Sequence, residues 1–130
     1  LERIWAEKSS GELKELAQAA HYTGNPNLAE KTWKRVRSRF AGQAVAASAA
    51  FFLGRMADQS GRASEAISLF DTYLREAPRG TYAAEALGRK LVLARGALGS
   101  DAAVRVARQY LARFPQGPYA SHARELLRGE

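Results

Sequence analysis

A stretch of sequence that begins at Tyr73 recurs at Tyr110, and this internal repeat constrains the fold more than any other feature of the chain. The two copies are 37 positions apart (110 minus 73) and share Tyr-Leu, a proline, a glycine, Tyr-Ala and a final alanine at the same spacing. Alanines at the same offset, Ala29, Ala66 and Ala103, extend the repeat to three copies. A period of this length is typical of solenoids, whose stacked units form long binding surfaces. We therefore expect a helical repeat protein that works by interaction.

Composition limits the chain to one domain and removes several kinds of chemistry. The chain has 130 residues, of which 46% are hydrophobic, and this is enough to form one domain that covers residues 1–130. The absence of cysteine excludes disulfides, thiol nucleophiles and cysteine-ligated metals. A net charge of +7 favours acidic partners, phosphates or anionic membrane surfaces. No apolar run approaches the roughly 20 residues that span a bilayer. Because the sequence opens at Leu1 in helix-like sequence without an initiator Met, we expect a fragment of a longer protein.

Apolar residues recur at helical spacing along most of the chain. Positions 66, 70, 73, 74 and 77 form one such face, and positions 103, 107, 110, 111 and 114 repeat it. Ser9 and Glu12 have the spacing of a capping box that opens a helix. Residues 1–8 are either a further helix or the remnant of an upstream unit. The pattern predicts no strand and helices at about 10–22, 27–40, 44–58, 63–77, 81–97, 101–114 and 118–128.

Turn residues divide these helices into hairpins. Gly24 and Gly61 suit the left-handed residue that ends a helix. Pro78 and Pro115 cannot continue a helix, so the preceding helices should end near residues 77 and 114. The predicted N-caps of the second helices are Asn27, Ser64 and Asp101. These signals predict units at about 9–42, 43–79 and 80–116, followed by a lone capping helix at 118–128. In the first unit, Arg37 breaks the apolar face, as a degenerate unit would.

The middle unit resembles the tetratricopeptide repeat through Leu53-Gly54, Gly61-Arg62 and the set Ala66, Phe70 and Pro78. The third unit departs from that pattern with Lys90-Leu91, the first lacks the closing proline, and the period exceeds the family's usual length of about 34 residues. The resemblance implies an all-α, right-handed superhelix of about three helical hairpins plus a C-terminal capping helix. It also implies a protein or peptide partner.

The closing phrase from Phe114 to Ala120, together with the long units, resembles bacterial cell-envelope members of this family. These are the periplasmic coordinator associated with the Tol-Pal system, the outer-membrane assembly lipoproteins and the periplasmic tails of membrane-bound sigma-factor regulators. This resemblance implies a periplasmic or cell-envelope location, in preference to the cytoplasm, within an envelope or signalling protein.

The sequence carries no pattern typical of catalysis or of metal and cofactor binding. His21 and His122 have no second histidine or carboxylate at a metal-ligand spacing. There is no glycine-rich phosphate loop, nucleophile elbow or Ser-His-Asp order. Asp58, Asp71 and Asp101 fall at turns or on helix surfaces, with nothing to indicate that two of them converge. We predict no enzymatic activity, no metal and no cofactor.

The densest cluster of charge is a basic amphipathic helix around Trp33. Because the apolar residues Trp33, Val36 and Phe40 recur at helical spacing, Trp33 is predicted to be a core anchor rather than a platform for base stacking. The basic residues then form a solvated outer face, a docking surface for an acidic partner, or a contact with nucleic acid or lipid. This predicted basic surface comprises Lys31, Lys34, Arg35 and Arg39.

The concave groove is the predicted site of partner binding, because the family resemblance implies that first helices line it. Phe51 lies opposite the apolar stripe of its helix, so it is either exposed in the groove or buried against a neighbouring unit. The family's clamp for a C-terminal carboxylate needs asparagines that these helices lack, which argues against that mode of recognition. The predicted groove residues are Lys14, Gln18, His21, Tyr22, Phe51, Arg55, Asp58, Glu85, Val92 and Arg95.

Three functions follow from this sequence. The first is a scaffold that binds a protein or peptide, with the basic charge favouring an acidic one. The second is binding of nucleic acid or an anionic surface through the basic helix at 31–39, which we expect less because the same residues suit a solvated face. The third is a spacer or self-association module, since the open end of a solenoid can stack on another copy.

Overall fold

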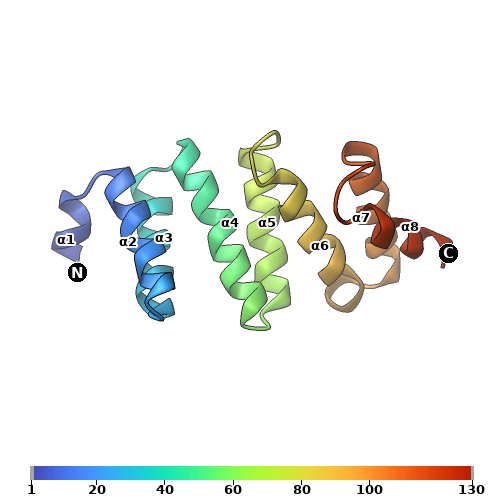
Figure 1. The fold of residues 1–130 in the computed structure, drawn as a ribbon, viewed down its shortest axis with the longest axis horizontal. Coiled ribbons are helices and arrows are strands. Elements are labelled where there is room, and N and C mark those ends of the chain that lie inside the picture. The colour runs from blue at the N-terminus through green and yellow to red at the C-terminus, as the bar shows by residue number, and fades with distance from the viewer. Residues whose placement is uncertain (1, 130) are drawn as a thin grey trace.

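The computed structural model describes residues 2–129, which form an array of eight helices without a strand. Figure 1 shows the helices standing side by side in a row, with the two ends of the chain at opposite ends of the array. No helix in this described range is long and apolar enough to cross a membrane. The all-α repeat architecture predicted from the sequence is confirmed. The helices are α1 (Glu2–Glu7), α2 (Ser10–Tyr22), α3 (Pro26–Arg39), α4 (Ala44–Gln59), α5 (Ala63–Glu76), α6 (Ala83–Leu98), α7 (Ser100–Arg113) and α8 (Ala120–Arg128).

From α2 onwards, each helix packs mainly against the next one in sequence, as in a solenoid. The hairpins are α2–α3, α4–α5 and α6–α7, and α8 follows as a single helix (Figure 1). The hydrophobic core is accordingly divided into three clusters along the array. Trp33 is 3% exposed within the first cluster, so its prediction as a core anchor is confirmed.

The predicted helix ends are correct to within two residues, while three predicted N-caps are wrong. The Ser9–Glu12 capping box is present, with Glu12 N–H donating to Ser9 Oγ at 3.1 Å. Gly24 and Gly61 have φ angles of 76° and 77°. The next backbone N–H after each glycine bonds back into the finished helix, as Asn25 does to the Ala20 carbonyl at 2.8 Å. The following helix can therefore begin at once, so the first two N-caps are Asn25 and Arg62 rather than Asn27 and Ser64. At the third turn, Gly99 both ends α6 and is the N-cap of α7, in place of Asp101.

Within each hairpin, a small residue on the first helix opposes a large one on the second, or the reverse. A Cβ built on Gly54 would lie 2.8 Å from the ring of Phe70, so α4 and α5 meet too closely for any side chain there. One repeat later, the equivalent positions are Leu91 and Ala107, which share a core cluster. One repeat earlier they are Ala17 and Trp33, again in one cluster. The volume at this contact is thus redistributed between the two helices from unit to unit.

The repeated tyrosines that define the period form a hydrogen bond at each of the last two joints between units. Tyr73 is 2% exposed, and its hydroxyl accepts the backbone N–H of Tyr82 at 2.9 Å. A Cβ at Gly80 would lie 2.1 Å from that hydroxyl, which explains the glycine of the repeated phrase. The same bond joins Tyr119 N–H to the Tyr110 hydroxyl at 3.1 Å. The helix α6 begins at Ala83, directly after this hydrogen-bonded turn and slightly later than predicted.

The first joint uses Arg37 in place of the tyrosine bond. Its guanidinium donates to the Ala46 carbonyl of α4 at 2.9 Å. It also forms a bidentate ion pair with Glu76 of α5, with distances of 2.6 Å to Oε1 and 3.0 Å to Oε2. The hydrogen bond from Arg37 lowers the pKa of Glu76 below its usual range, despite the opposing effect of partial burial. Arg37 therefore connects the first hairpin to the second, a role that its break in the apolar face did not predict.

Candidate functional site

A pocket of about 310 Å³ lies between α2 and α4, on the first helices of two successive units. Its floor is Phe52, whose ring stacks on buried Trp33 with a centroid distance of 4.8 Å and an interplanar angle of 21°. Tyr22 stands at its edge and is 88% exposed. We call this the aromatic pocket, and the residues that line it are Gln18, His21, Tyr22, Trp33, Phe52, Arg55, Met56 and Gln59.

The exposed aromatic and cationic groups of this pocket are available to a partner. His21 packs edge-on against Tyr22, with ring centroids 6.2 Å apart. The guanidinium carbon of Arg55 lies 5.8 Å from the centroid of the Phe52 ring. Among the ion pairs of residues 2–129, none involves Arg55. The aromatic pocket can thus accept an apolar side chain on its floor and a carboxylate at Arg55.

A second pocket, between α4 and α6, continues from the first because Arg55 and Gln59 line both. We call it the charged pocket. Its volume is about 360 Å³, and Asp58, Glu85 and Arg89 complete its lining. Arg89 Nε donates to Asp58 Oδ2 at 2.7 Å, which connects two units across the groove. The charges of this pocket balance, since two arginines face two carboxylates.

Tyr119 of the following unit closes one side of this arrangement. Its hydroxyl donates to Glu85 Oε1 at 2.9 Å. Burial, followed by the hydrogen bond with Glu85, raises the pKa of the Tyr119 phenol. The phenol therefore stays protonated and keeps its role as the donor. Asp58 pairs with Arg89 and Glu85 accepts from Tyr119, so Arg55 is the arginine of this pocket that forms no ion pair within residues 2–129.

The structure brings most of the predicted groove residues together along α2, α4 and α6. Gln18, His21, Tyr22 and Arg55 share the aromatic pocket, and Arg55, Asp58 and Glu85 share the charged pocket. Lys14 and Val92 are exposed but line neither pocket. Arg95 lines a separate cleft at the C-terminal end of the array.

Phe51 does not belong to the binding surface, and its inclusion among the groove residues is corrected here. The side chain is 1% exposed, because its ring stacks on Tyr82 of the next unit at 4.4 Å and 5°. The neighbouring Phe52 reaches the pocket instead, with Met56 and Gln59. The sequence contained the signal for this set, because positions 52, 55, 56 and 59 share one face of a helix. We predicted Arg55 from that face without its neighbours.

The predicted basic surface is largely engaged within the chain. Arg35 forms an ion pair with Glu2 of α1. Arg39 donates to the carbonyl of Trp5 at 2.6 Å and also to the carbonyl of Lys8. Lys34 pairs with Glu30 at 3.6 Å. Lys31 and Lys34 are exposed, whereas the two arginines hold α1 against α3, with Trp5 buried in the first core cluster. Residues 2–7 thus form a helix that packs on the first hairpin.

Within the part of the chain that the structure describes, no three His, Asp or Glu side chains lie close enough to hold a metal ion. His21 lies against Tyr22 at the end of α2, and His122 lies on α8. The two histidines are therefore on different helices of different units.

Comparison with known proteins identifies the repeat. A family model described as tetratricopeptide repeat matches residues 14–81, which is somewhat more than half of the 130 residues. The matched range runs from Lys14 in α2 to Thr81 in the turn between α5 and α6, and it includes the entire aromatic pocket. No curated protein matches the chain.

Proposed function

Because the chain belongs to the tetratricopeptide-repeat family, whose members are non-enzymatic protein–protein interaction modules, we propose that it binds a peptide segment of another protein in the groove formed by α2, α4 and α6. The predicted partner is a protein or peptide, and the reaction is binding alone. The predicted units at about 9–42, 43–79 and 80–116 would then each contribute a first helix to this groove or to its end.

The observation that carries this proposal is the aromatic pocket. Tyr22 exposes 88% of its surface beside the stacked rings of Phe52 and Trp33, and Arg55 lies over Phe52. Exposed tyrosine and arginine beside an apolar pocket are the residue types that dominate binding energy at interfaces. A peptide with an apolar residue next to an acidic one fits this chemistry. The apolar side chain would contact Phe52, and the carboxylate would pair with Arg55.

A peptide selection tests this proposal without knowledge of the partner. Peptides selected from a phage-displayed random library against the protein should be enriched in apolar-acidic pairs. Their affinity for Tyr22→Ala and Arg55→Glu should fall by at least about tenfold, equivalent to about 1.4 kcal/mol. Titration calorimetry with the synthetic peptides measures the change.

A charge-matched control is Arg75→Glu, which makes the same change on an exposed position of α5 outside both pockets. The selected peptides should bind this variant as they bind the original protein. Equal affinities for the Tyr22, Arg55 and Arg75 variants would show that the groove is not the binding site.

The proposal extends to a bacterial envelope or signalling protein in the periplasm or cell envelope. Its support is the resemblance of the long units and of the phrase from Phe114 to Ala120 to envelope members of the family. The reading frame upstream of residue 1 tests it. A signal peptide or membrane helix there would support the envelope, whereas a DNA-binding or kinase domain would indicate a cytoplasmic regulator.

A further inference from the structure

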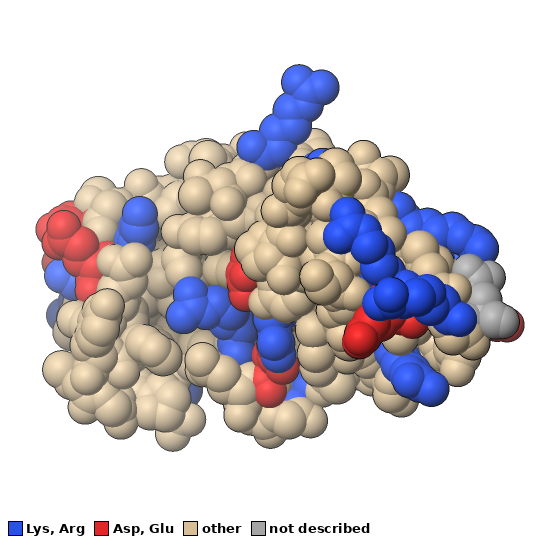
Figure 2. Space-filling model, turned by 45° about the vertical axis from the view of Figure 1, so that its right-hand side comes forward, with Lys and Arg blue, Asp and Glu red and all other residues tan. Residues whose placement is uncertain are grey.

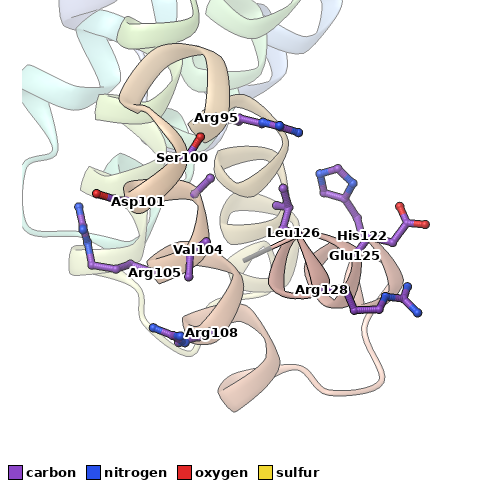
Figure 3. Close-up of a pocket in the computed structure, with 12 residues that line it drawn as sticks. Arg95, Ser100, Asp101, Val104, Arg105, Arg108, His122, Glu125, Leu126 and Arg128 are labelled. Carbon is purple, nitrogen blue, oxygen red and sulfur yellow. The ribbon is translucent and has the colours of Figure 1, made fainter.

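A cleft of about 1040 Å³ lies at the C-terminal end of the array, lined by the end of α6, by α7 and by α8. Figure 2 shows Lys and Arg side chains gathering at this end of the molecule, and Figure 3 shows the residues of the cleft. Side chains of α7 and α8 flank it, with Leu126 between them and Arg95 at one end (Figure 3). We call it the C-terminal cleft. It lies outside the groove pockets proposed above for the peptide.

Comparison with the preceding junction shows that the sign of the charge is reversed here. The repeat of 37 residues places Arg95 where the charged pocket has Asp58, and His122 where it has Glu85. Arg89, the partner of Asp58 across that junction, is replaced by Leu126. The α5–α6 ion pair between Asp71 and Lys90, at 2.7 Å, likewise becomes Arg108 and Leu127. At these positions the carboxylates have become basic residues, and their cationic partners have become leucines.

The arginines of the cleft outnumber its acidic groups. Among the described residues, four arginines and two carboxylates line it, against two of each in the charged pocket. Arg95, Arg105 and Arg128 form no ion pair with any carboxylate in residues 2–129. All three are exposed. Among the described residues, Arg95 and Arg105 therefore lack a carboxylate partner of the kind that Asp58 provides for Arg89 at the preceding junction, and an acidic ligand would supply one.

The remaining lining distinguishes a peptide from other anions. Leu126, Val104 and Ala103 give the cleft an apolar part. Asp101 and Glu125 also line it and would repel a continuous run of phosphates. A polypeptide can place an aliphatic side chain on Leu126 and carboxylates on the arginines while avoiding the two acidic residues. The mixture therefore favours an acidic amphipathic peptide over nucleic acid or a lipid surface.

We infer that the C-terminal cleft is a second docking surface, and that it binds an acidic, amphipathic segment of a partner protein through Arg95 and Arg105 with Leu126 beneath. This inference rests on the charge reversal at the last junction and does not depend on the aromatic pocket. The two surfaces can therefore be tested separately.

Two synthetic probes test the inference. One is an amphipathic peptide with glutamate and leucine on adjacent helical faces, and the other is the same peptide with glutamine for glutamate. The glutamate peptide should bind and shift the amide resonances of Val104, His122 and Leu126 in NMR spectra. Its affinity should fall by at least about tenfold in Arg95→Glu/Arg105→Glu and should decrease with added salt, because the contacts are ionic. The glutamine peptide should bind at least about tenfold more weakly than its twin.

The matched control is Arg75→Glu/Arg79→Glu, which changes the charge equally at two exposed positions outside the cleft. The glutamate peptide should bind this variant and Tyr22→Ala as it binds the original protein. The peptides selected from the phage library should lose affinity for Tyr22→Ala and keep it for Arg75→Glu/Arg79→Glu. Circular dichroism establishes that each variant is folded. The inference is overturned if the glutamate peptide does not bind, if both double variants weaken it equally, or if single-stranded DNA or anionic vesicles bind the same residues more tightly.

Discussion

Gly88 and Gly96 lie on the same helix, α6, in opposite surroundings. A Cβ at Gly88 would lie 2.1 Å from Cδ2 of Tyr119, whereas a Cβ at Gly96 would meet nothing within 4 Å. Gly88 is also the repeat equivalent of Phe51, whose ring stacks on Tyr82. The absence of a side chain thus lets Tyr119 lie against α6, within hydrogen-bonding distance of Glu85.

We expect Gly88→Ala and Gly96→Ala to change stability in opposite directions. The first should lower the free energy of unfolding by about 1–3 kcal/mol, because the ring of Tyr119 must move. The second should raise it by up to about 1 kcal/mol, because alanine favours a helix interior over glycine. Urea denaturation followed by circular dichroism measures both values. A change of the same sign in the two variants would contradict the close approach at Gly88.

At the scale of residues, the sequence predicted which side chains leave the core of their own helix better than it predicted which of them are covered by a neighbouring unit. Helical periodicity separated Gln18, His21, Tyr22 and Arg55 from the core, and the family resemblance placed them on one surface. The sequence could not decide whether Phe51 was exposed, because that depends on where Tyr82 of the next unit lies. Contacts between units are long-range, and periodicity within one helix carries no information about them.

At the scale of helices, each hairpin has a contact between one large and one small residue, and the helix that carries the large residue differs from hairpin to hairpin. Gly54 opposes Phe70 in the second hairpin, and Leu91 and Ala107 occupy the equivalent places in the third. Because each pair shares one space, neither member can be exchanged independently of the other.

Exchanging the pair of the second hairpin for that of the third tests this matching. Gly54→Leu alone should destabilise by about 1–3 kcal/mol through overpacking, and Phe70→Ala alone by about 3–5 kcal/mol through a cavity. The double variant should be more stable than the sum of these effects by about 1–3 kcal/mol, because leucine fills the space that the ring leaves. A double-mutant cycle by chemical denaturation measures the coupling, and strictly additive effects would argue against a shared space.

The helices themselves were predictable, because glycine, proline and the apolar period mark them locally. The N-caps were misplaced since the turns after Gly24 and Gly61 are complete within one residue. The role of Arg37 was not predictable from its own helix. Its partners, Ala46 and Glu76, lie on α4 and α5, and the sequence period gives no geometry for such contacts.

At the scale of the whole molecule, stability is divided among neighbouring units. The core consists of successive clusters, and Trp33 belongs to the first while Tyr110 belongs to the last. In such arrays each unit depends on its neighbours and little on distant units. A destabilising substitution at one end of the array should therefore unfold the units near it and leave distant units folded.

Hydrogen exchange measured by mass spectrometry tests this expectation. Trp33→Ala should cost about 3–5 kcal/mol and remove protection from α2 and α3, while α6 and α7 keep most of theirs. Tyr110→Ala should produce the reverse pattern. Uniform loss of protection along the chain in either variant would indicate a single cooperative core.

The hydrogen bond between a buried tyrosine and the N–H nine residues later has a consequence for how such an array can diversify. Its parts, Tyr73, Gly80 and Tyr82, all lie within ten successive positions, 73 to 82, and recur from Tyr110 to Tyr119. None of these groups is charged. The curvature at a joint is thereby separated from the chemistry of the surface, so successive junctions can acquire opposite charges, as at Asp58 and Arg95, without altering the path of the superhelix.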